Sequence, residues 1–262
     1  MKQIIFKRRL QIVIVILIII FSNCSPSEKT VKKRQNNPNI IFIVVDDLSY
    51  WPFNKNVQKS SITPNIDRLS SEGVFFTNAY CQSPLSSPSR ASLFTGLRPS
   101  TSGIYGMIKD DSIKKDSPIT KDIIFLPEYF RKNGYYTMGI GKIFDEHAPK
   151  GIFDESGGRV PGFGPLPQNR FVWKNYSPKE GYGSTGTDWG AFPDVDSLMP
   201  DYQSAKWVID RLNRNYNTPF FLAVGFLRPH VPWYVPKKWF ESHPLENIAT
   251  PPFLAADLND VY

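Results

Sequence analysis

The sequence predicts an α/β protein, a layered domain with a mostly parallel central sheet flanked by helices. Two observations predict this class: an uninterrupted run of β-branched and aromatic residues, and a helix-to-strand alternation that repeats along the chain. The composition agrees, because 41% of the 262 residues are hydrophobic and only 21% are charged. A chain of this kind can bury a large core, which excludes a disordered tail, a coiled coil and a collagen-like rod.

The first strand is predicted at residues 39–45, Asn-Ile-Ile-Phe-Ile-Val-Val. A continuous apolar run is typical of a strand that is buried on both faces of a parallel sheet. A helix is predicted at 64–72, with Thr63 as its N-cap, proline in its first position and Gly73 at its end. Residues 74–79 are predicted to form a second strand.

The alternation continues downstream. A helix at 126–133 is predicted to precede a strand at 135–140, and a helix at 202–213 is predicted to precede a strand at 220–226. Residues 145–201 are rich in Gly, Pro and aromatic residues without periodicity. We therefore expect long loops in this region, facing the substrate.

The formal net charge of +7 belongs to the N-terminal segment. Residues 1–34 contain eight of the 31 Lys and Arg residues but only one of the 24 Asp and Glu residues, which leaves 23 of each sign in the rest of the chain. The basic charge therefore belongs to an address segment rather than to a face that binds nucleic acid. No nucleic-acid partner is therefore expected.

Residues 1–24 have the organisation of a secretory signal. Three basic residues at 7–9 precede ten apolar residues at 12–21, a run too short to span a bilayer comfortably, and Cys24 follows closely. This arrangement resembles a bacterial lipoprotein signal, in which the cysteine is acylated; plain secretion and an uncleaved anchor are the alternatives. We expect an exported lipoprotein, anchored in a membrane and facing the periplasm or the cell surface, with 25–38 as a polar tether.

Two adjacent carboxylates, Asp46 and Asp47, follow the first predicted strand. In open α/β sheets, ligands bind beyond the carboxyl ends of the strands. Adjacent carboxylates repel each other unless a cation lies between them, and hard divalent cations prefer oxygen ligands. These two residues alone do not distinguish a metal site from an ordinary turn with one solvated carboxylate.

Residues 81–96 form a second candidate, Cys-Gln-Ser-Pro-Leu-Ser-Ser-Pro-Ser-Arg-Ala-Ser-Leu-Phe-Thr-Gly. Two prolines among hydroxyl residues predict a rigid loop, and 89–95 are predicted to begin a helix whose N-terminus favours an anion. Arg90 adds a permanent charge and a bidentate donor. An anion site and a plain serine-rich loop both remain open here. Cys81 is expected to be a small buried hydrophobic side chain.

Residues 86–90, Ser-Ser-Pro-Ser-Arg, followed by Ala-Ser-Leu-Phe-Thr-Gly, resemble the signature of the type I, formylglycine-dependent sulfatases of the alkaline phosphatase superfamily. The flanking sequence agrees. Residues 63–69 and 73–80 are similar to the stretch that leads into this signature, and residues 39–47 resemble the first, metal-binding strand of the family.

Two further motifs follow in the order that the family has. Gly141-Lys142 matches its Gly-Lys sulfate contact, and residues 220–233 resemble the segment that bears its substrate histidine, here His230. The residues of both motifs are most similar to those of the iduronate-2-sulfatase-like branch. A pentapeptide can recur by chance, but five ordered motifs over 39 to about 245 predict an alkaline phosphatase/sulfatase-like fold and a sulfatase activity.

The resemblance implies a nucleophile and a metal. Ser86 would be converted to formylglycine by a radical-type maturase, and the aldehyde would hydrate to a gem-diol that attacks sulfur. Its second hydroxyl would let the covalent sulfate ester collapse back to aldehyde. Asp46, Asp47 and Ser86 would hold one divalent cation, expected to be Ca²⁺. Because Asp46 and Asp47 follow a strand, we expect that replacing either with alanine leaves the fold largely intact.

The resemblance also assigns the residues around the sulfate. Arg90 would stabilise the gem-diol, while Lys142 and His230 would bind the sulfate or protonate the leaving oxygen. Outside this context, Lys142 would be interpreted as a solvated surface group and His230 as a packed loop histidine.

The chain departs from the family at two points. In this branch a histidine usually stands three residues after the lysine, where this chain has Asp145; His147 is a nearby substitute. Family members also continue for roughly as many residues again, with further metal ligands and another lysine. The resemblance therefore implies that residues 39–262 are the N-terminal portion of a truncated catalytic domain.

Three functions follow as hypotheses. The first is hydrolysis of the sulfate esters of a sulfated carbohydrate, such as a glycosaminoglycan-like or algal polymer. The second is phosphoryl-ester hydrolysis, which would keep Ser86 as a hydroxyl; the Pro-Ser-Arg that ends the signature argues against it. The third is a truncated surface fragment without catalytic activity.

Overall fold

The computed structural model describes residues 37–53, 61–115, 117–160, 162–169 and 188–248, together with 256 and 259. Residues from Pro38 onward belong to one compact unit. The predicted signal, Cys24 and nearly all of the tether lie outside the described residues. Among the residues that are described, no helix combines the length and the apolar composition needed to cross a membrane.

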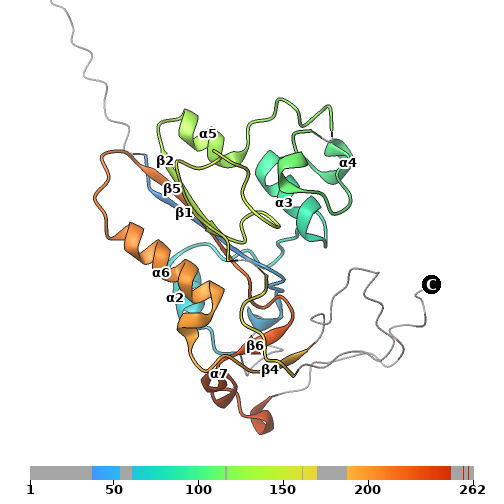
Figure 1. The fold of residues 1–262 in the computed structure, drawn as a ribbon, viewed down its shortest axis with the longest axis vertical. Coiled ribbons are helices and arrows are strands. Elements are labelled where there is room, and N and C mark those ends of the chain that lie inside the picture. Colours follow the sequence, from blue (N-terminus) through green and yellow to red (C-terminus); the bar gives the residue numbers. More distant parts are fainter. Residues whose placement is uncertain are drawn as a thin grey trace, which may run out of the picture. The chain divides into compact units, whose positions relative to one another are not determined.

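A four-stranded parallel sheet lies at the centre of the unit (Figure 1). Its order is β1 (Ile40–Val45), β5 (Phe220–Phe226), β2 (Tyr136–Gly141) and β3 (Glu155–Gly158). The register aligns Val45 with Phe226 and Gly141 with Gly225, so the carboxyl ends of β1, β5 and β2 meet at one edge. The predicted α/β class and the parallel sheet are confirmed.

Helices cover the sheet on both faces (Figure 1). The helix α6 (Pro200–Leu212) packs on β5 and β2, whereas α3 (Ser86–Thr95) and α5 (Leu126–Lys132) share the core on the opposite face. The strand β5 is buried on both faces because its alternate side chains enter two cores. Phe220, Leu222 and Val224 enter the core with α6, and Phe221 and Ala223 enter the core with α3.

Most predicted elements are confirmed. The predicted helix at 64–72 is α2 (Pro64–Glu72), and those at 126–133 and 202–213 correspond to α5 and α6 within two residues. The predicted strands at 39–45, 135–140 and 220–226 correspond to β1, β2 and β5. The helix α3 begins at Ser86, three residues earlier than predicted, because Pro88 is its third residue and proline is tolerated in the first turn of a helix.

Two predictions about strands are wrong. Residues 74–79 are not a strand, because no described strand lies beside them to accept their backbone hydrogen bonds, and Val74 and Phe76 are exposed. The strand β1 is not buried on both faces. It lies at the edge of the sheet, where α6 does not reach it, and Ile41 and Ile43 are about half exposed.

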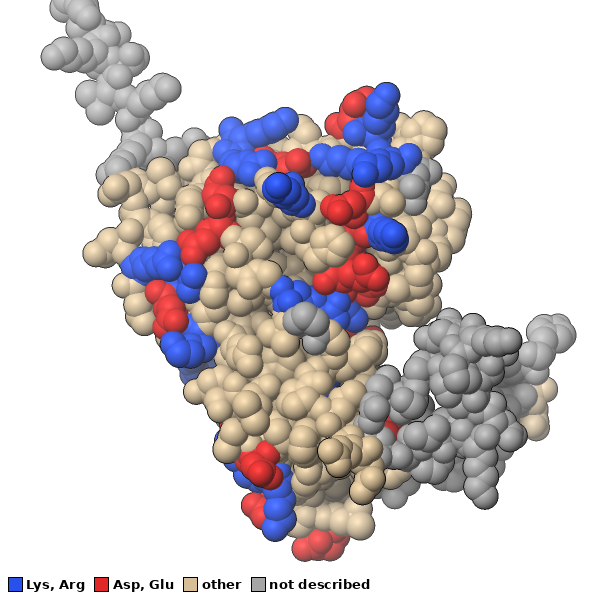
Figure 2. Space-filling view, viewed as in Figure 1, with Lys and Arg blue, Asp and Glu red and all other residues tan. Residues whose placement is uncertain are grey.

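A second, two-stranded parallel sheet pairs β4 (Trp189–Ala191) with β6 (Trp233–Val235). The strands β3 and β4 lie within the region predicted as long loops; 161 and 170–187 of that region are outside the described residues. On the face shown in Figure 2, Lys and Arg side chains lie among Asp and Glu side chains. The remaining elements are α4 (Pro99–Ser102), α7 (Lys237–Glu241) and 3-10 turns at Trp51–Phe53, Asp110–Ser112, Asp196–Leu198 and Leu245–Asn247.

The exposed apolar side chains of α2 and the segment after it predict self-association. Val74 and Phe76 are 79% and 74% exposed, and no residue of α2 is buried. We expect the double variant Val74→Ser/Phe76→Ser to bind less of the dye ANS and to sediment closer to monomer, with an unfolding free energy changed by about 0.5 kcal/mol or less. As a control, Phe94→Ala in the core costs about 3–5 kcal/mol. Unchanged dye binding and association in the double variant would contradict the prediction.

Candidate active site

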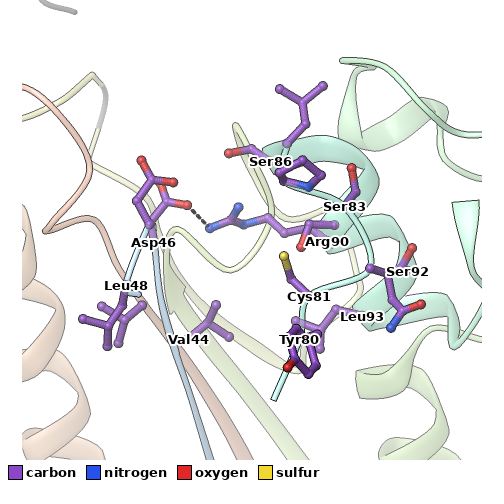
Figure 3. A pocket seen from close by; sticks show the side chains of 16 residues that line it. Val44, Asp46, Leu48, Tyr80, Cys81, Ser83, Ser86, Arg90, Ser92 and Leu93 are labelled. Carbon is purple, nitrogen blue, oxygen red and sulfur yellow. Dashed lines mark hydrogen bonds and ion pairs between the residues drawn. The ribbon is translucent and has the colours of Figure 1, made fainter. Parts of the chain in front are cut away.

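A buried carboxylate lies where three strand ends and α3 converge. The backbone N–H of Asp46 donates to the Phe226 carbonyl at 3.0 Å, which extends the pairing of β1 with β5. Its side chain, 4% exposed, accepts from Arg90 Nη2 at 2.8 Å and from Lys142 Nζ at 2.5 Å. Figure 3 shows Arg90 reaching toward Asp46 across the cavity. The structure therefore brings together three of the predicted site residues.

The charges of this cluster are balanced inside the protein. Burial by itself would raise the pKa of Asp46, but Arg90 and Lys142 outweigh it and hold this pKa below its usual value. Arg90 and Lys142 are 5% and 4% exposed, so Lys142 is not the solvated surface group that it would be taken for outside the family context. Two fixed cations in a buried setting can donate hydrogen bonds to the oxygens of an anionic ligand.

Two glycines allow Lys142 to reach the cluster. Gly141 has a φ of +82°, and a Cβ atom there would lie 2.1 Å from the Gly225 carbonyl oxygen. A Cβ atom at Gly225 would lie equally close to the backbone of Lys142. Side chains at either position would force β2 and β5 apart where the Lys142 N–H donates to the Gly225 carbonyl at 2.9 Å. The backbone conformation and the close contact with Gly225 therefore explain why position 141 of the Gly-Lys motif is a glycine.

Ser86 begins α3 and lines a cavity of about 790 Å³ between that helix and the end of β1. Helix N-termini favour negative charge, and the cavity also contains Asp46, Asp47 and Arg90. Among the described residues, Arg90 Nε is buried without a hydrogen-bond partner, so one guanidinium donor is left for another oxygen. Cys81 lines the same cavity and is exposed, which corrects the expectation that it is buried (Figure 3).

Asp47 and His230 form a second, more exposed pair. The Asp47 Oδ2 and His230 Nε2 atoms are 3.8 Å apart, and their side chains are 55% and 22% exposed. Asp47 has a φ of +56°, an uncommon value for a residue other than glycine. This backbone turns Asp47 away from Asp46, so the two carboxylates are held in different environments. The ring of Phe163 stacks on His230 with centroids 5.0 Å apart.

Asp145, rather than His147, occupies the position beside Lys142. Its carboxylate lies 3.7 Å from Lys142 Nζ and 3.4 Å from the Ser87 hydroxyl, and it is buried. His147 instead faces Asp111 at 3.3 Å, with both side chains 53% exposed. His147 therefore does not substitute for the histidine that the resemblance leads one to expect.

Two residues that the sequence did not single out hold the loop after Lys142. The buried Asp110 accepts hydrogen bonds from the backbone N–H groups of 145, 146 and 147 at 2.7–3.1 Å. Burial raises the pKa of Asp110 more than these bonds lower it. Arg159 Nη1 donates to the Asp145 carbonyl and, at 3.3 Å, to the Glu146 carbonyl. No local pattern separates Asp110 from its exposed neighbour Asp111, and Arg159 lies in an aperiodic segment.

The residues present fit part of a divalent-cation site. Asp46 and Asp47 supply the carboxylate oxygens that a hard cation prefers, but both Asp46 oxygens are paired with Arg90 and Lys142. In the described part of the chain, no three His, Cys, Asp or Glu residues gather closely enough to hold a metal. Calcium takes roughly six to eight oxygen ligands, so these aspartates would be two members of a larger shell.

Comparison with known proteins agrees with this geometry. The sequence model of the Sulfatase family matches residues 38–249. The chain belongs to the sulfatase family. It is 57% identical over 246 residues to a sulfatase of Formosa agariphila, covering 91% of this chain, and 32% identical over 249 residues to human iduronate 2-sulfatase, covering 86% of it. Sulfatases hydrolyse sulfate esters, and the predicted family is confirmed.

The matched regions are only part of these relatives. This sulfatase chain covers 48% of the Formosa protein and 41% of the human one, so it spans less than half of either. Among solved structures, a phosphonate monoester hydrolase of Agrobacterium radiobacter aligns with a TM-score of 0.51 and 23% identity, over 79% of this chain and 44% of that one. This likeness establishes the shared fold alone.

The Asp46 cluster leads to a prediction about stability. The variant Asp46→Asn would leave Arg90 and Lys142 buried without their anion, so we expect a loss of about 3–5 kcal/mol in unfolding free energy. This differs from the expectation that the fold tolerates replacement of Asp46. As a control, Asp210→Asn breaks an exposed pair with Lys206 and should cost about 1 kcal/mol or less.

The pH dependence provides a second readout for the same variant. Because the pKa of folded Asp46 lies below the usual 3.8, its ionisation stabilises the fold above pH 3.8. This contribution is lost as the pH falls below 3.8 through the lowered pKa. In urea titrations, the difference in unfolding free energy between wild type and Asp46→Asn should therefore narrow below pH 3.8. A difference that is already small at pH 7 would refute the claim that ionised Asp46 stabilises the fold by pairing with Arg90 and Lys142.

Proposed function

We propose that the protein containing this chain hydrolyses sulfate esters of a carbohydrate, with position 86 as the nucleophile. The observation that carries the proposal is the buried cluster of Asp46, Arg90 and Lys142 beside Ser86, at the N-terminus of α3, in a member of the sulfatase family. A sulfate ester bound here would place its anionic oxygens near two fixed cations and a helix N-terminus.

A serine hydroxyl is a poor nucleophile, so the proposal includes conversion of Ser86 to formylglycine by an oxygen-independent maturase. When hydrated, that aldehyde would supply a hydroxyl that attacks sulfur and a second one that allows sulfate to leave. Ser86 is half-buried and lines the cavity, where a substrate could approach it.

The other residues take roles that follow from their contacts. Arg90, with one unused donor, would orient the oxygens on residue 86. Lys142 would bind a sulfate oxygen, and its two carboxylate neighbours orient its ammonium group. His230, half-buried beside Asp47, would protonate the leaving oxygen.

Asp46 and Asp47 would hold a divalent cation, expected to be Ca²⁺, in the completed site. Such an ion would neutralise sulfate oxygens and acidify an attacking hydroxyl. For Asp46 to serve as a ligand, one of its present partners has to move, and the Nζ of Lys142 is the more mobile of the two because it ends a flexible side chain.

The substrate class and location complete the proposal. Human relatives are named iduronate 2-sulfatase and N-acetylgalactosamine-6-sulfatase, so a sulfated glycosaminoglycan-like polymer is the substrate class we favour. The N-terminal signal pattern supports export and a lipid anchor at Cys24. An exported, anchored enzyme would meet a polymeric substrate outside the cytoplasm.

Mass spectrometry of the peptide that contains residue 86 tests the nucleophile. When the protein that contains this chain is expressed with an oxygen-independent maturase, this peptide should be about 2 Da lighter than its serine form, from loss of two hydrogens. Ser86→Ala should abolish both the modification and the hydrolysis of an aryl sulfate. The control Ser83→Ala, another half-buried serine of the same cavity, should retain both. Activity with an unmodified Ser86 would favour a hydroxyl nucleophile and contradict the proposal.

Calcium-dependent stabilisation tests the metal. Calcium should raise the unfolding temperature of the wild type, because a ligand that binds only the folded state stabilises it. Asp47→Asn should remove this increase. The control Asp111→Asn alters a similarly exposed aspartate that also faces a histidine, and should keep it. Equal responses of the two variants would exclude Asp47 as a ligand.

A further inference from the structure

The small sheet of β4 and β6 presents two tryptophans side by side. Trp189 and Trp233 are register partners in parallel strands, so their side chains project from the same face, with backbones about 4.8 Å apart. They are 66% and 51% exposed. At the next pair, Gly190 lies opposite Tyr234, which is buried on the other face. The alternation therefore directs two large indole rings outward.

A buried aspartate fixes this arrangement. The Asp188 carbonyl accepts from the Trp233 N–H at 2.8 Å, and its carboxylate accepts from the Trp189 N–H at 2.9 Å and from the Tyr234 hydroxyl. The Trp233 indole N–H donates to the Pro229 carbonyl at 2.6 Å, which sets the orientation of that ring. The pair is thus held in place before any ligand binds, which lowers the entropy cost of binding.

The tryptophan pair is close in the chain to a residue of the candidate active site. Trp233 follows His230 by three residues, and His230 lies 3.8 Å from Asp47 in the wall of the cavity. The half-buried guanidinium of Arg228 holds the loop between them, donating to the His230 carbonyl at 3.3 Å and to the Phe163 carbonyl at 2.8 Å. The Trp233 indole, which donates to the carbonyl of the residue before His230, therefore lies within reach of a ligand that extends from His230 by one more sugar ring.

We propose that Trp189 and Trp233 form a stacking platform for a pyranose ring of the saccharide, one sugar away from the ring that carries the sulfate. The inference rests on the proposed function and adds a second subsite to it. Pyranose faces present C–H groups, which an indole face binds by apolar burial and by its negative quadrupole. Neither position carries a charge, so the platform would select a sugar ring while the cationic cluster selects the sulfate.

Calorimetric titration with a dermatan sulfate tetrasaccharide and with the monosaccharide N-acetylgalactosamine 4-sulfate tests the platform. Trp189→Ala and Trp233→Ala should each raise the Kd for the tetrasaccharide about tenfold and leave the Kd for the monosaccharide within about twofold. Trp239→Ala is the matched control: Trp239 is 51% exposed, and its indole N–H donates to Asp196 at 2.8 Å. This control should change neither Kd.

The outcomes separate the platform from the proposed function. Unchanged tetrasaccharide binding in both variants, with monosaccharide binding intact, would overturn the platform and leave the proposed function standing. A wild type that binds neither saccharide would overturn both. Variants that only associate less with themselves, without a change in Kd, would show that the indoles bind polypeptide and would overturn the platform.

A phenylalanine variant covers the case in which an alanine variant unfolds. Trp233→Phe keeps an aromatic face, and its Kd for the tetrasaccharide should stay within about threefold of the wild type. A larger loss of affinity in the folded phenylalanine variant would count against stacking.

Discussion

The ion cluster at Asp46 is the interaction on which the site depends. One buried carboxylate joins Arg90, 44 residues later in the chain, and Lys142, 96 residues later. In a low-dielectric environment an unpaired charge is costly, so each member holds the other two in place. The same contacts tie β1, α3 and the end of β2 together, and they position Ser86 at the mouth of the cavity by fixing the helix that it begins.

Close backbone contact makes this cluster possible. The glycines at 141 and 225 let the backbones of β2 and β5 approach so closely that a Cβ atom at either position would clash with the other strand. Lys142 follows directly after this contact. Asp110 and Arg159 then hold the following loop by its N–H groups and its carbonyls. The backbone of Lys142 is therefore positioned from both sides, while the Nζ at the end of its flexible side chain can still change partners.

Charge and apolar surface are separated along the path that a saccharide would follow. The cavity beside α3 is lined by Arg90 together with Asp46 and Asp47, whereas the sheet of β4 and β6 presents neutral aromatic rings. Asp145 adds a carboxylate to the cationic side, but it is paired with Lys142 and so does not face the cavity as a free negative charge. This separation suits a ligand with a sulfate at one end and sugar rings at the other.

Local patterns in the sequence determined most of the elements and the residues of the site. The apolar run at 220–226 and the proline and glycine boundaries of α2 report preferences that neighbouring residues set by themselves. The motifs around Asp46, Ser86, Lys142 and His230 were identified by their resemblance to a family. Only the tertiary structure decided that residues 74–79 lack a partner strand, that β1 is an edge strand, and that Asp145 rather than His147 contacts Lys142. It also decided the roles of Asp110 and Arg159 and the pairing of the two tryptophans. The physical reason is that strand pairing, burial and charge pairing depend on groups distant in the chain, which a periodicity or a motif does not specify.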